Sequence, residues 1–495
     1  MLSAILLGVV LRIWLFTRFD SLWRDESSML LAIHHRPWAE LAAPLEDDQK
    51  CPVLLAVLYK ALLEFLPVQE AWLKVPGLGV SLAALPLLAS VLVRLGVSPC
   101  GRFAVVSMAA VSPGWILFSC QAKPYAFDIL ASLLLVWHGL RALERPGSLR
   151  DAGLLAFLSA FCVSMSFAAL FVAGSLWAAL VLAQGRRSAR SVVLSIVAVA
   201  LLTPLAFVGS GPPTPYMAQF WKDAFPSAEV GWWIDAAVRT LSAGFLPPLV
   251  LGTVGVAVVS GLPLGPFALL GTGRLLAESA ASRANQARAL LLLLPIPLAL
   301  AASALHRYPF AARTLLFSSP LVLLVAGLGW ETVRKRPPGR IAASVLFGGA
   351  VLTFLAVDVL SFGRTVAGVG QALERARSSE NPGDLIVCDL FAAPTLRLRQ
   401  EFPTLGPLPV NPIQYEWILA SRSEGRPSPE EIVTGLAGAR SVHFIAERAG
   451  YHRTVTGRLS HPAQRLLGLL EAERQEVGRL EGERAVWVKL ERRVP

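Results

Sequence analysis

The sequence is poor in charged residues. Only 16% of its 495 residues are Asp, Glu, Lys or Arg, whereas 54% are hydrophobic, and soluble chains usually carry about 25% charged residues. This shortage excludes an ordinary water-soluble protein. The hydrophobic residues gather in long blocks, and a helix needs about 20 such residues to cross the hydrocarbon core of a bilayer. The sequence therefore predicts an α-helical polytopic membrane protein.

The sequence also lacks paired cysteines and a concentrated basic stripe. Its five cysteines form neither a CxxC pair nor a metal-ligand spacing, so we assign no disulfide and no zinc site. The Lys and Arg residues that give the net charge of +11 are scattered through loops. Scattered loop charges are typical of the positive-inside rule. Nucleic acid is therefore not expected as a partner.

Long apolar blocks predict about eleven membrane crossings. They lie at 2–17, 75–94, 103–119, 126–140, 152–166, 168–183, 191–208, 245–270, 289–305, 314–330 and 341–360. We interpret the first as a retained span and not as a removed signal peptide, because no small-residue cleavage site follows it. The segment 52–67 is too short to cross and carries Lys60 and Glu64 on one side. It predicts an interfacial amphipathic helix in the first outer loop.

With that assignment, the basic loops of the chain share one side, which the positive-inside rule makes cytoplasmic. The opposite, outer side then holds 18–51, 120–125, 209–243 and 306–313. It also holds the tail, in which helix-like and strand-like segments alternate. The helix-like segments are 371–380 and 461–480, and the strand-like ones are 384–390, 441–447 and 484–491. We expect a transmembrane domain at 1–360 and a small α/β extracytoplasmic domain at 361–495.

The first outer loop is acidic. Asp25 and Glu26 follow Trp23, and Glu46, Asp47 and Asp48 come further on. Paired carboxylates at a membrane surface can deprotonate a hydroxyl group or hold a divalent cation. Asp25 and Glu26 would be the ligands if a metal is bound, and no other cofactor is indicated. A solvated acidic loop is the alternative.

Basic and aromatic residues recur in the other outer segments. Lys50 either contacts a phosphate or snorkels to the interface, and Lys123 and Tyr125 occupy the next outer turn. Asp128 lies inside a predicted span, where an ionisable residue is costly and therefore a functional candidate, with an ion-pair partner as the alternative.

Two further outer segments carry candidate residues. Arg suits bidentate phosphate recognition, which makes Arg313 a candidate beside Tyr308, and headgroup anchoring is the alternative. The aromatic residues of 209–243 suit either a sugar face or, as we favour, an interfacial belt.

The order of these motifs resembles the C-fold (GT-C) membrane glycosyltransferases, in particular the bacterial family 39 or protein-mannosyltransferase-like enzymes. Four matches carry the resemblance over residues 1–360: the WxDE loop, the basic residue before Pro52, KPYxxD and YPFxxR. Relatives often have Pro-Pro where this chain has Cys51 and Pro52. The tail resembles the variable extracytoplasmic domain of such enzymes and carries no specific motif.

The resemblance implies a function. The family moves a sugar from a polyprenyl-phosphate carrier to an acceptor lipid, glycan or protein at the outer face of the bacterial inner membrane. It implies Asp25 as the base, with Glu26 as its orienting neighbour. Donor and acceptor contacts would come from Trp23, Lys50, Lys123, Tyr125, Asp128, Tyr308 and Arg313. A transporter or flippase of a lipid-linked substrate, and a structural assembly subunit, are the alternatives.

Overall fold

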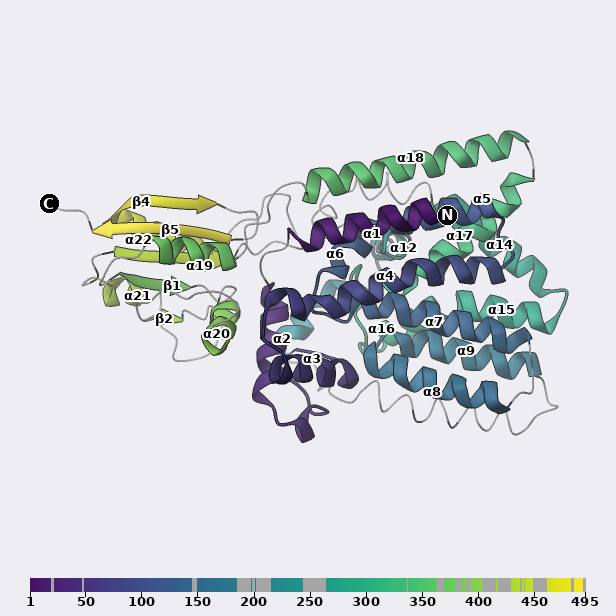
Figure 1. Ribbon diagram of the computed structural model, residues 1–495, viewed down its shortest axis with the longest axis horizontal. Coiled ribbons are helices and arrows are strands. Elements are labelled where there is room, and N and C mark those ends of the chain that lie inside the picture. Colours follow the sequence, from purple (N-terminus) through teal and green to yellow (C-terminus); the bar gives the residue numbers. More distant parts are fainter. Residues whose placement is uncertain are drawn as a thin grey trace. The chain divides into compact units, whose positions relative to one another are not determined.

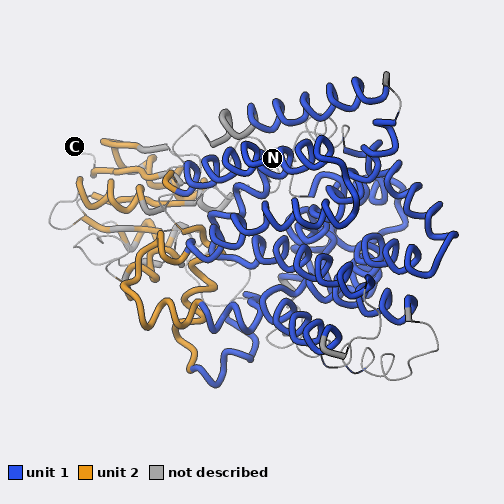
Figure 2. Tube along the Cα trace, turned by 45° about the vertical axis from the view of Figure 1, so that its right-hand side comes forward, with its two compact units in different colours: residues 1–16, 38–58, 74–363 blue, residues 17–37, 59–73, 364–495 orange. Residues whose placement is uncertain are grey.

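The computed structural model is mostly helical (Figure 1). It describes residues 1–18, 22–46, 49–144, 149–184, 197, 201, 215–243, 264–335, 337–362, 369–379, 384–388, 393–402, 415–416, 429–436, 439, 441–447, 461–481 and 485–492. The chain forms two compact units (Figure 2). Unit 1 contains 1–16, 38–58 and 74–363, and unit 2 contains 17–37, 59–73 and 364–495.

Unit 1 consists of apolar helices. Its long elements are α1 (Leu2–Phe16), α4 (Glu70–Arg94, from Lys74 onward), α5 (Pro99–Ala110), α6 (Pro113–Ser119), α7 (Tyr125–Glu144), α8 (Leu149–Met165), α9 (Ala169–Gln184), α14 (Leu264–Ser279), α15 (Arg283–Leu293), α16 (Pro295–Ala304), α17 (Ser318–Arg334) and α18 (Pro337–Phe362). Shorter elements are η1 (Trp38–Glu40), α11 (Pro215–Phe220), η3 (Lys222–Ala224) and α12 (Val230–Ser242). Helix α3 (Val53–Phe65) is shared between the two units.

Helices occupy the positions of nine expected spans: α1, α4, α5 with α6, α7, α8, α9, α15 with α16, α17 and α18. Among the described residues, three helices are long and apolar enough to cross a membrane, or five if each bent pair counts as one span. The expected span 191–208 lies almost entirely outside the described residues, as does the first part of 245–270. The count of about eleven stays a prediction. The described helix α14 (Leu264–Ser279) continues beyond residue 270, where the expected span ends, and it packs along α17.

The close contact of α14 with α17 depends on glycine. A Cβ atom at Gly271 would overlap the carbonyl oxygen of Val325, and one at Gly329 would overlap that of Phe267. Small residues let helix backbones approach closely in membrane proteins. These two positions therefore fix the spacing of the two helices.

A buried arginine closes the break between α5 and α6. These helices meet at an angle of 53°, which leaves carbonyl groups at the end of α5 without helical partners. Arg12 of α1 is fully buried and donates to the carbonyl oxygens of Ala109 and Ala110 and to the Ser81 hydroxyl of α4. One guanidinium group thus joins α1, α4 and α5.

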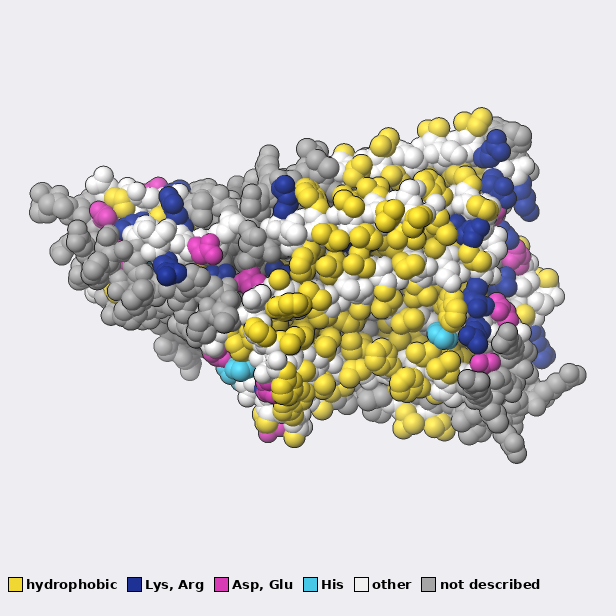
Figure 3. Space-filling model, in the orientation of Figure 1, with side chains coloured by type: hydrophobic (Ala, Val, Ile, Leu, Met, Phe, Trp, Pro, Cys, Tyr) yellow, Lys and Arg dark blue, Asp and Glu magenta, His cyan; other side chains and the backbone are white. Residues whose placement is uncertain are grey.

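Polar contacts bring several helix ends of unit 1 together. Arg94 at the end of α4 pairs with Glu144 at the end of α7 over 2.7 Å. The Glu331 carboxylate near the end of α17 accepts from the backbone N–H and hydroxyl of Ser98, the N-cap of α5. Figure 3 shows a broad apolar surface over the helices of unit 1. On this face, Lys and Arg side chains gather at the right-hand end of the helices. This gathering agrees with the basic loops' sharing one side.

Unit 2 contains α2 (Arg24–His35) and an α/β tail. The tail elements are α19 (Val369–Ser378), β1 (Leu385–Cys388), α20 (Ala393–Glu401), β2 (Tyr415–Glu416), α21 (Pro429–Gly435), β3 (Ser441–Glu447), α22 (His461–Glu473), β4 (Arg474–Glu481) and β5 (Ala485–Arg492). The sheet order is β2-β1-β3-β5-β4. Strand β1 is parallel to β2 and β3, and β5 is antiparallel to β3 and β4.

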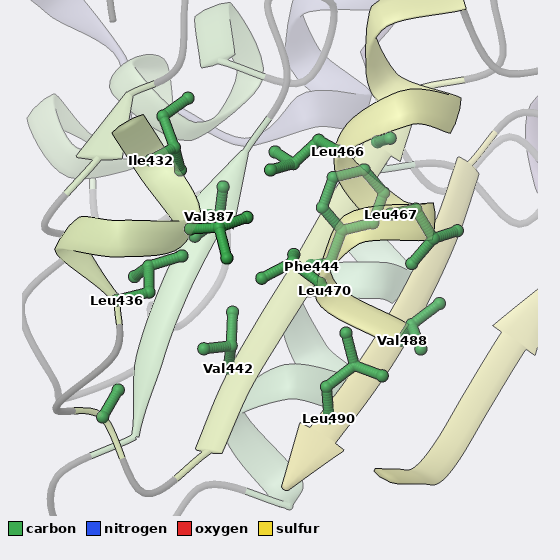
Figure 4. Packing of buried hydrophobic residues seen from close by; sticks show 13 residues of the cluster. Val387, Ile432, Leu436, Val442, Phe444, Leu466, Leu467, Leu470, Val488 and Leu490 are labelled. Carbon is green, nitrogen blue, oxygen red and sulfur yellow. The ribbon is translucent and has the colours of Figure 1, made fainter. Parts of the chain in front are cut away.

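Alternation along the strands creates two apolar faces. Val442 and Phe444 point to one face, where they pack with Val488, Leu490, α21 and α22 (Figure 4). Ile445 points to the other face and packs with α19 and α20. Helices therefore cover both faces of the sheet.

The expected helix 461–480 was wrong in its second half. The helix ends at Glu473, and β4 begins at the next residue. Arg474 is buried and donates to the carbonyl oxygens of Leu436 and Ala439, while β4 pairs with β5. These long-range partners override the helix-like local pattern.

Candidate functional site

Asp128 is buried in the first turn of α7. The Ser166 hydroxyl, in the connection between α8 and α9, donates to its carboxylate over 2.5 Å. Ser166 also accepts the backbone N–H of Ala169, the first residue of α9. Asp128 therefore ties the start of α7 to the turn between α8 and α9.

Tyr308 lies in the turn between α16 and α17 and shares the neighbourhood of Asp128. Its hydroxyl donates to the Thr314 carbonyl oxygen over 2.5 Å, and its ring meets Phe171 edge-on at 4.9 Å. Burial raises the pKa of the Tyr308 phenol well above its usual value, and Asp128 and Tyr125 nearby act in the same direction. Tyr308 is thus a neutral hydroxyl beside a buried acid, where it can contribute hydrogen bonds without adding charge.

Lys123 brings together two segments that the sequence analysis expects on the outer side. Its side chain is buried, and its ammonium group donates to the Gln49 side chain over 2.9 Å. Lys50 follows Gln49 and is exposed, so both candidate phosphate-binding lysines lie in adjoining segments. The next residue, Cys51, is buried, and burial raises the pKa of its thiol to about 12, although Lys123 acts to lower it.

The turn that carries Lys123 packs closely on α4. A Cβ atom at Gly77 would lie 2.8 Å from the Gln121 carbonyl oxygen and 3.1 Å from that of Ser119. Tyr125, the first residue of α7, meets Phe118 of α6 edge-on at 4.8 Å. The absence of a side chain at Gly77 therefore helps to place Lys123 and Tyr125.

Arg313 is stacked on aromatic residues from the segment before α12. Its guanidinium carbon lies 4.8 Å from the centre of the Trp221 ring and 6.0 Å from that of Phe220. Cation–π stacking leaves the edge of a guanidinium group able to donate to a phosphate. Arg239 supports this arrangement, because it donates to the carbonyl oxygen of Phe310 over 3.0 Å.

The acidic motif with Asp25 and Glu26 begins helix α2. Trp23 is its N-cap, and the Glu26 carboxylate accepts the Trp23 backbone N–H over 2.7 Å. Glu26 is buried, whereas Asp25 is half-buried. A carboxylate three residues after the N-cap is a common way to satisfy a free N–H at a helix start. Glu26 therefore has a structural use in fixing the turn that carries Asp25.

The predicted site residues divide between the two units. Trp23, Asp25 and Glu26 belong to unit 2, and the six others belong to unit 1. Asp47 and Asp48 lie outside the described residues. The part of the chain that the structure describes contains no group of three or more His, Cys, Asp or Glu residues placed to hold a metal ion.

Sequence reasoning missed two partners of these residues. Ser166 and Gln49 contact Asp128 and Lys123 directly, yet neither belongs to a motif. Serine recurs throughout the apolar segments of this sequence, so Ser166 carried no distinguishing signal.

Comparison with known proteins gives similar structures at low sequence identity. No protein-family model matches the chain, and no curated protein does. The oligosaccharyltransferase of Archaeoglobus fulgidus, solved with a tethered acceptor peptide, is 11% identical, with a TM-score of 0.46 over 84% of this chain and 60% of that one. ArnT from Cupriavidus metallidurans in the apo state is 12% identical, with a TM-score of 0.47 over 98% of this chain and 97% of that one. The structure of ArnT bound to undecaprenyl phosphate is 13% identical in sequence to this chain, with a TM-score of 0.43.

Proposed function

We propose that this chain is a membrane glycosyltransferase that moves a sugar from a polyprenyl-phosphate carrier to an acceptor hydroxyl at the outer face of the membrane. The observation that carries the proposal is the gathering of motif residues in unit 1. The Lys123 turn contacts the segment before Lys50, and Tyr308 shares the neighbourhood of Asp128 and Tyr125. These residues come from outer segments that the motif order had already singled out.

The chemistry of a lipid-phosphate sugar fits these residue types. The donor brings its own leaving group, so the enzyme must stabilise charge that develops on the departing phosphate and remove a proton from the acceptor. Lys50, Lys123 and Arg313 are the proposed phosphate contacts. Asp128 and the neutral Tyr308 hydroxyl offer hydrogen bonds to a sugar or acceptor.

In the proposed reaction, Asp25 takes the proton of the acceptor hydroxyl as the acceptor oxygen forms a bond to the anomeric carbon. The bond between that carbon and the phosphate oxygen breaks, and its electron pair leaves with the polyprenyl phosphate. A single displacement of this kind inverts the anomeric centre. Glu26 acts through the first turn of α2, which its carboxylate closes.

Purified protein with a labelled polyprenyl-phosphate sugar tests the proposal. We expect transfer to an acceptor in the wild type and a loss on the order of 100-fold or more in Asp25→Asn, the usual contribution of a general base. Arg313→Gln should weaken donor binding, because a phosphate contact is lost. Unchanged turnover in Asp25→Asn would remove Asp25 as the base.

The same assay separates the alternative functions. Movement of the labelled lipid across a vesicle membrane without sugar transfer would support a transporter. Neither movement nor transfer would support a structural subunit. Insensitivity to a chelator would exclude a divalent cation held by Asp25 and Glu26.

A further inference from the structure

Helix α20 of the tail runs alongside α2. Near the start of both helices, the hydroxyl groups of Ser27 and Thr395 lie 3.1 Å apart. Near their ends, His35 pairs with Glu401 over 2.6 Å, and His34 lies 3.5 Å from the same carboxylate. Because the two links follow the same order in both helices, α20 is parallel to α2 and contacts it over about two turns.

A buried ion pair strengthens this arrangement. Arg399 of α20 and Glu70, the first residue of α4, lie 3.0 Å apart, and their side chains are only 3% and 11% exposed. Removing one partner of a buried pair is strongly destabilising, because the other charge is left uncompensated. The tail is therefore held to the segment 59–73 as well as to α2.

The end of α2 has a second support. Lys60 donates to the His34 carbonyl oxygen over 2.6 Å and pairs with Glu64 over 2.8 Å. A cation at the last carbonyl groups of a helix is favourable. Helix α2 is thus fixed at its first turn by Glu26, along one side by α20 and at its last turn by Lys60.

We propose that Thr395 and Glu401 of α20 are positioning residues for Asp25 and act through α2. This inference rests on the proposed function, in which Asp25 is the base. Asp25 and Ser27 lie in the same short helix, so a shift of α2 against α20 moves the carboxylate with it. A displacement of about 1 Å at a reacting group can cost on the order of 100-fold in rate.

Steady-state kinetics with the full chain tests the inference. The double variant Thr395→Val with Glu401→Leu removes both side-chain links to α2. We expect a fall in kcat on the order of 10- to 100-fold, with the donor KM within about twofold, since the phosphate contacts proposed in unit 1 are unchanged. Arg397→Gln is the matched control, because Arg397 is exposed on the same helix, and it should leave kcat unchanged.

A conservative change separates positioning from folding. Arg399→Lys keeps the charge beside Glu70 and should retain most of the wild-type kcat, whereas Arg399→Gln should lower kcat. The double variant Arg399→Gln with Glu70→Gln leaves no unpaired charge at this position. If it restores kcat, the contact between residues 399 and 70 matters and the charge of Arg399 does not. If the double variant at Thr395 and Glu401 turned over like the wild type, the inference would be wrong.

A crosslink tests the contact without relying on activity. Ser27→Cys and Thr395→Cys place two thiols where hydroxyl groups now lie 3.1 Å apart. Cys100→Ser removes the exposed native thiol. We expect diamide to join the new cysteines and the oxidised protein to keep its transfer activity. No crosslink, or activity that returns only after reduction, would overturn the inference.

The two proposals fail in different ways. Absence of transfer in the wild type would refute the proposed function and the inference with it. The inference alone would be refuted if the wild type transfers sugar, Asp25→Asn does not, and the double variant at Thr395 and Glu401 is fully active.

Discussion

Ser166 donates its hydroxyl proton to the Asp128 carboxylate over 2.5 Å, and this bond joins α7 to the connection between α8 and α9. The relationship explains how an acid is held inside a predicted span. The carboxylate accepts this hydrogen bond and lies near Tyr308 and Tyr125, which fits the substrate contact that we propose for it.

Asp128→Asn should lower sugar transfer on the order of tenfold or more, because precise placement of polar groups around a substrate governs the rate. Ser166→Ala should have a smaller effect, since it removes one hydrogen bond worth about 1 kcal/mol. Asp151→Asn, at the opposite end of α8, is the control. Turnover by purified protein is the measurement, and equal losses in Asp128→Asn and Asp151→Asn would contradict the prediction.

Gly271→Ala should destabilise unit 1 by about 1–3 kcal/mol or more, the usual cost of overpacking. The new methyl group would overlap the Val325 carbonyl oxygen of α17. Gly273→Ala, two residues away on α14, has open space around its Cβ position and should be neutral or stabilising. Thermal unfolding in detergent distinguishes them, and similar melting temperatures would refute this view of the helix contact.

The stability of unit 2 should fall as the pH drops below about 6.5. Burial lowers the pKa of His34, as do Lys60 and His35, while Glu401 and Glu64 act to raise it. A lowered folded-state pKa means that the unfolded chain binds the proton first, so acid favours unfolding. Unfolding followed between about pH 8 and pH 5 is the measurement.

Two variants test this assignment to His34. His34→Gln should reduce the pH dependence, because it removes the titrating group. Glu401→Gln should increase it, because it removes the charge that favours protonated His34. An unchanged slope in His34→Gln would assign the effect to another group.

Cys51 should resist alkylation in the folded protein. Its thiol is buried, with a pKa of about 12, and the thiolate is the reactive form. Cys100 is exposed and should react first, which provides an internal control. Peptide mapping after maleimide treatment is the measurement, and early labelling of Cys51 would contradict the burial.

The same thiol gives a prediction at alkaline pH. Because the pKa of Cys51 is raised in the folded state, its contribution to stability is complete below the unfolded value of about 8.5. That contribution is lost as the pH rises toward about 12, since the unfolded chain releases its proton first. Cys51→Ala should reduce this alkaline loss.

Span lengths and motif order could be predicted from the sequence because both are local properties. Helices occupy nine expected spans, and the turn before Asp128 falls where KPYxxD indicated. The hydrogen-bond partners of Asp128 and Lys123 could not be predicted. Ser166 and Gln49 come from segments distant in the chain and belong to no pattern.

The tail was likewise predictable only in part. Strands lie at the expected positions of β1, β3 and β5, but β4 begins within a segment that resembles a helix. Its conformation depends on pairing with β5 and on the buried Arg474. The short helix α20 was not expected at all. Helix α2 belongs to the same unit as the tail because of contacts between residues more than 300 positions apart, which no local pattern indicates.

Arg12 has a consequence for biosynthesis. A charged residue within a lone membrane helix is costly to insert, and the partners that Arg12 of α1 contacts on α4 and α5 are synthesised later. We therefore expect the first helix to be a poor independent membrane anchor. We expect it to stay beside the translocon until Ser81 and the end of α5 have been synthesised, so that three helices enter the bilayer as one group.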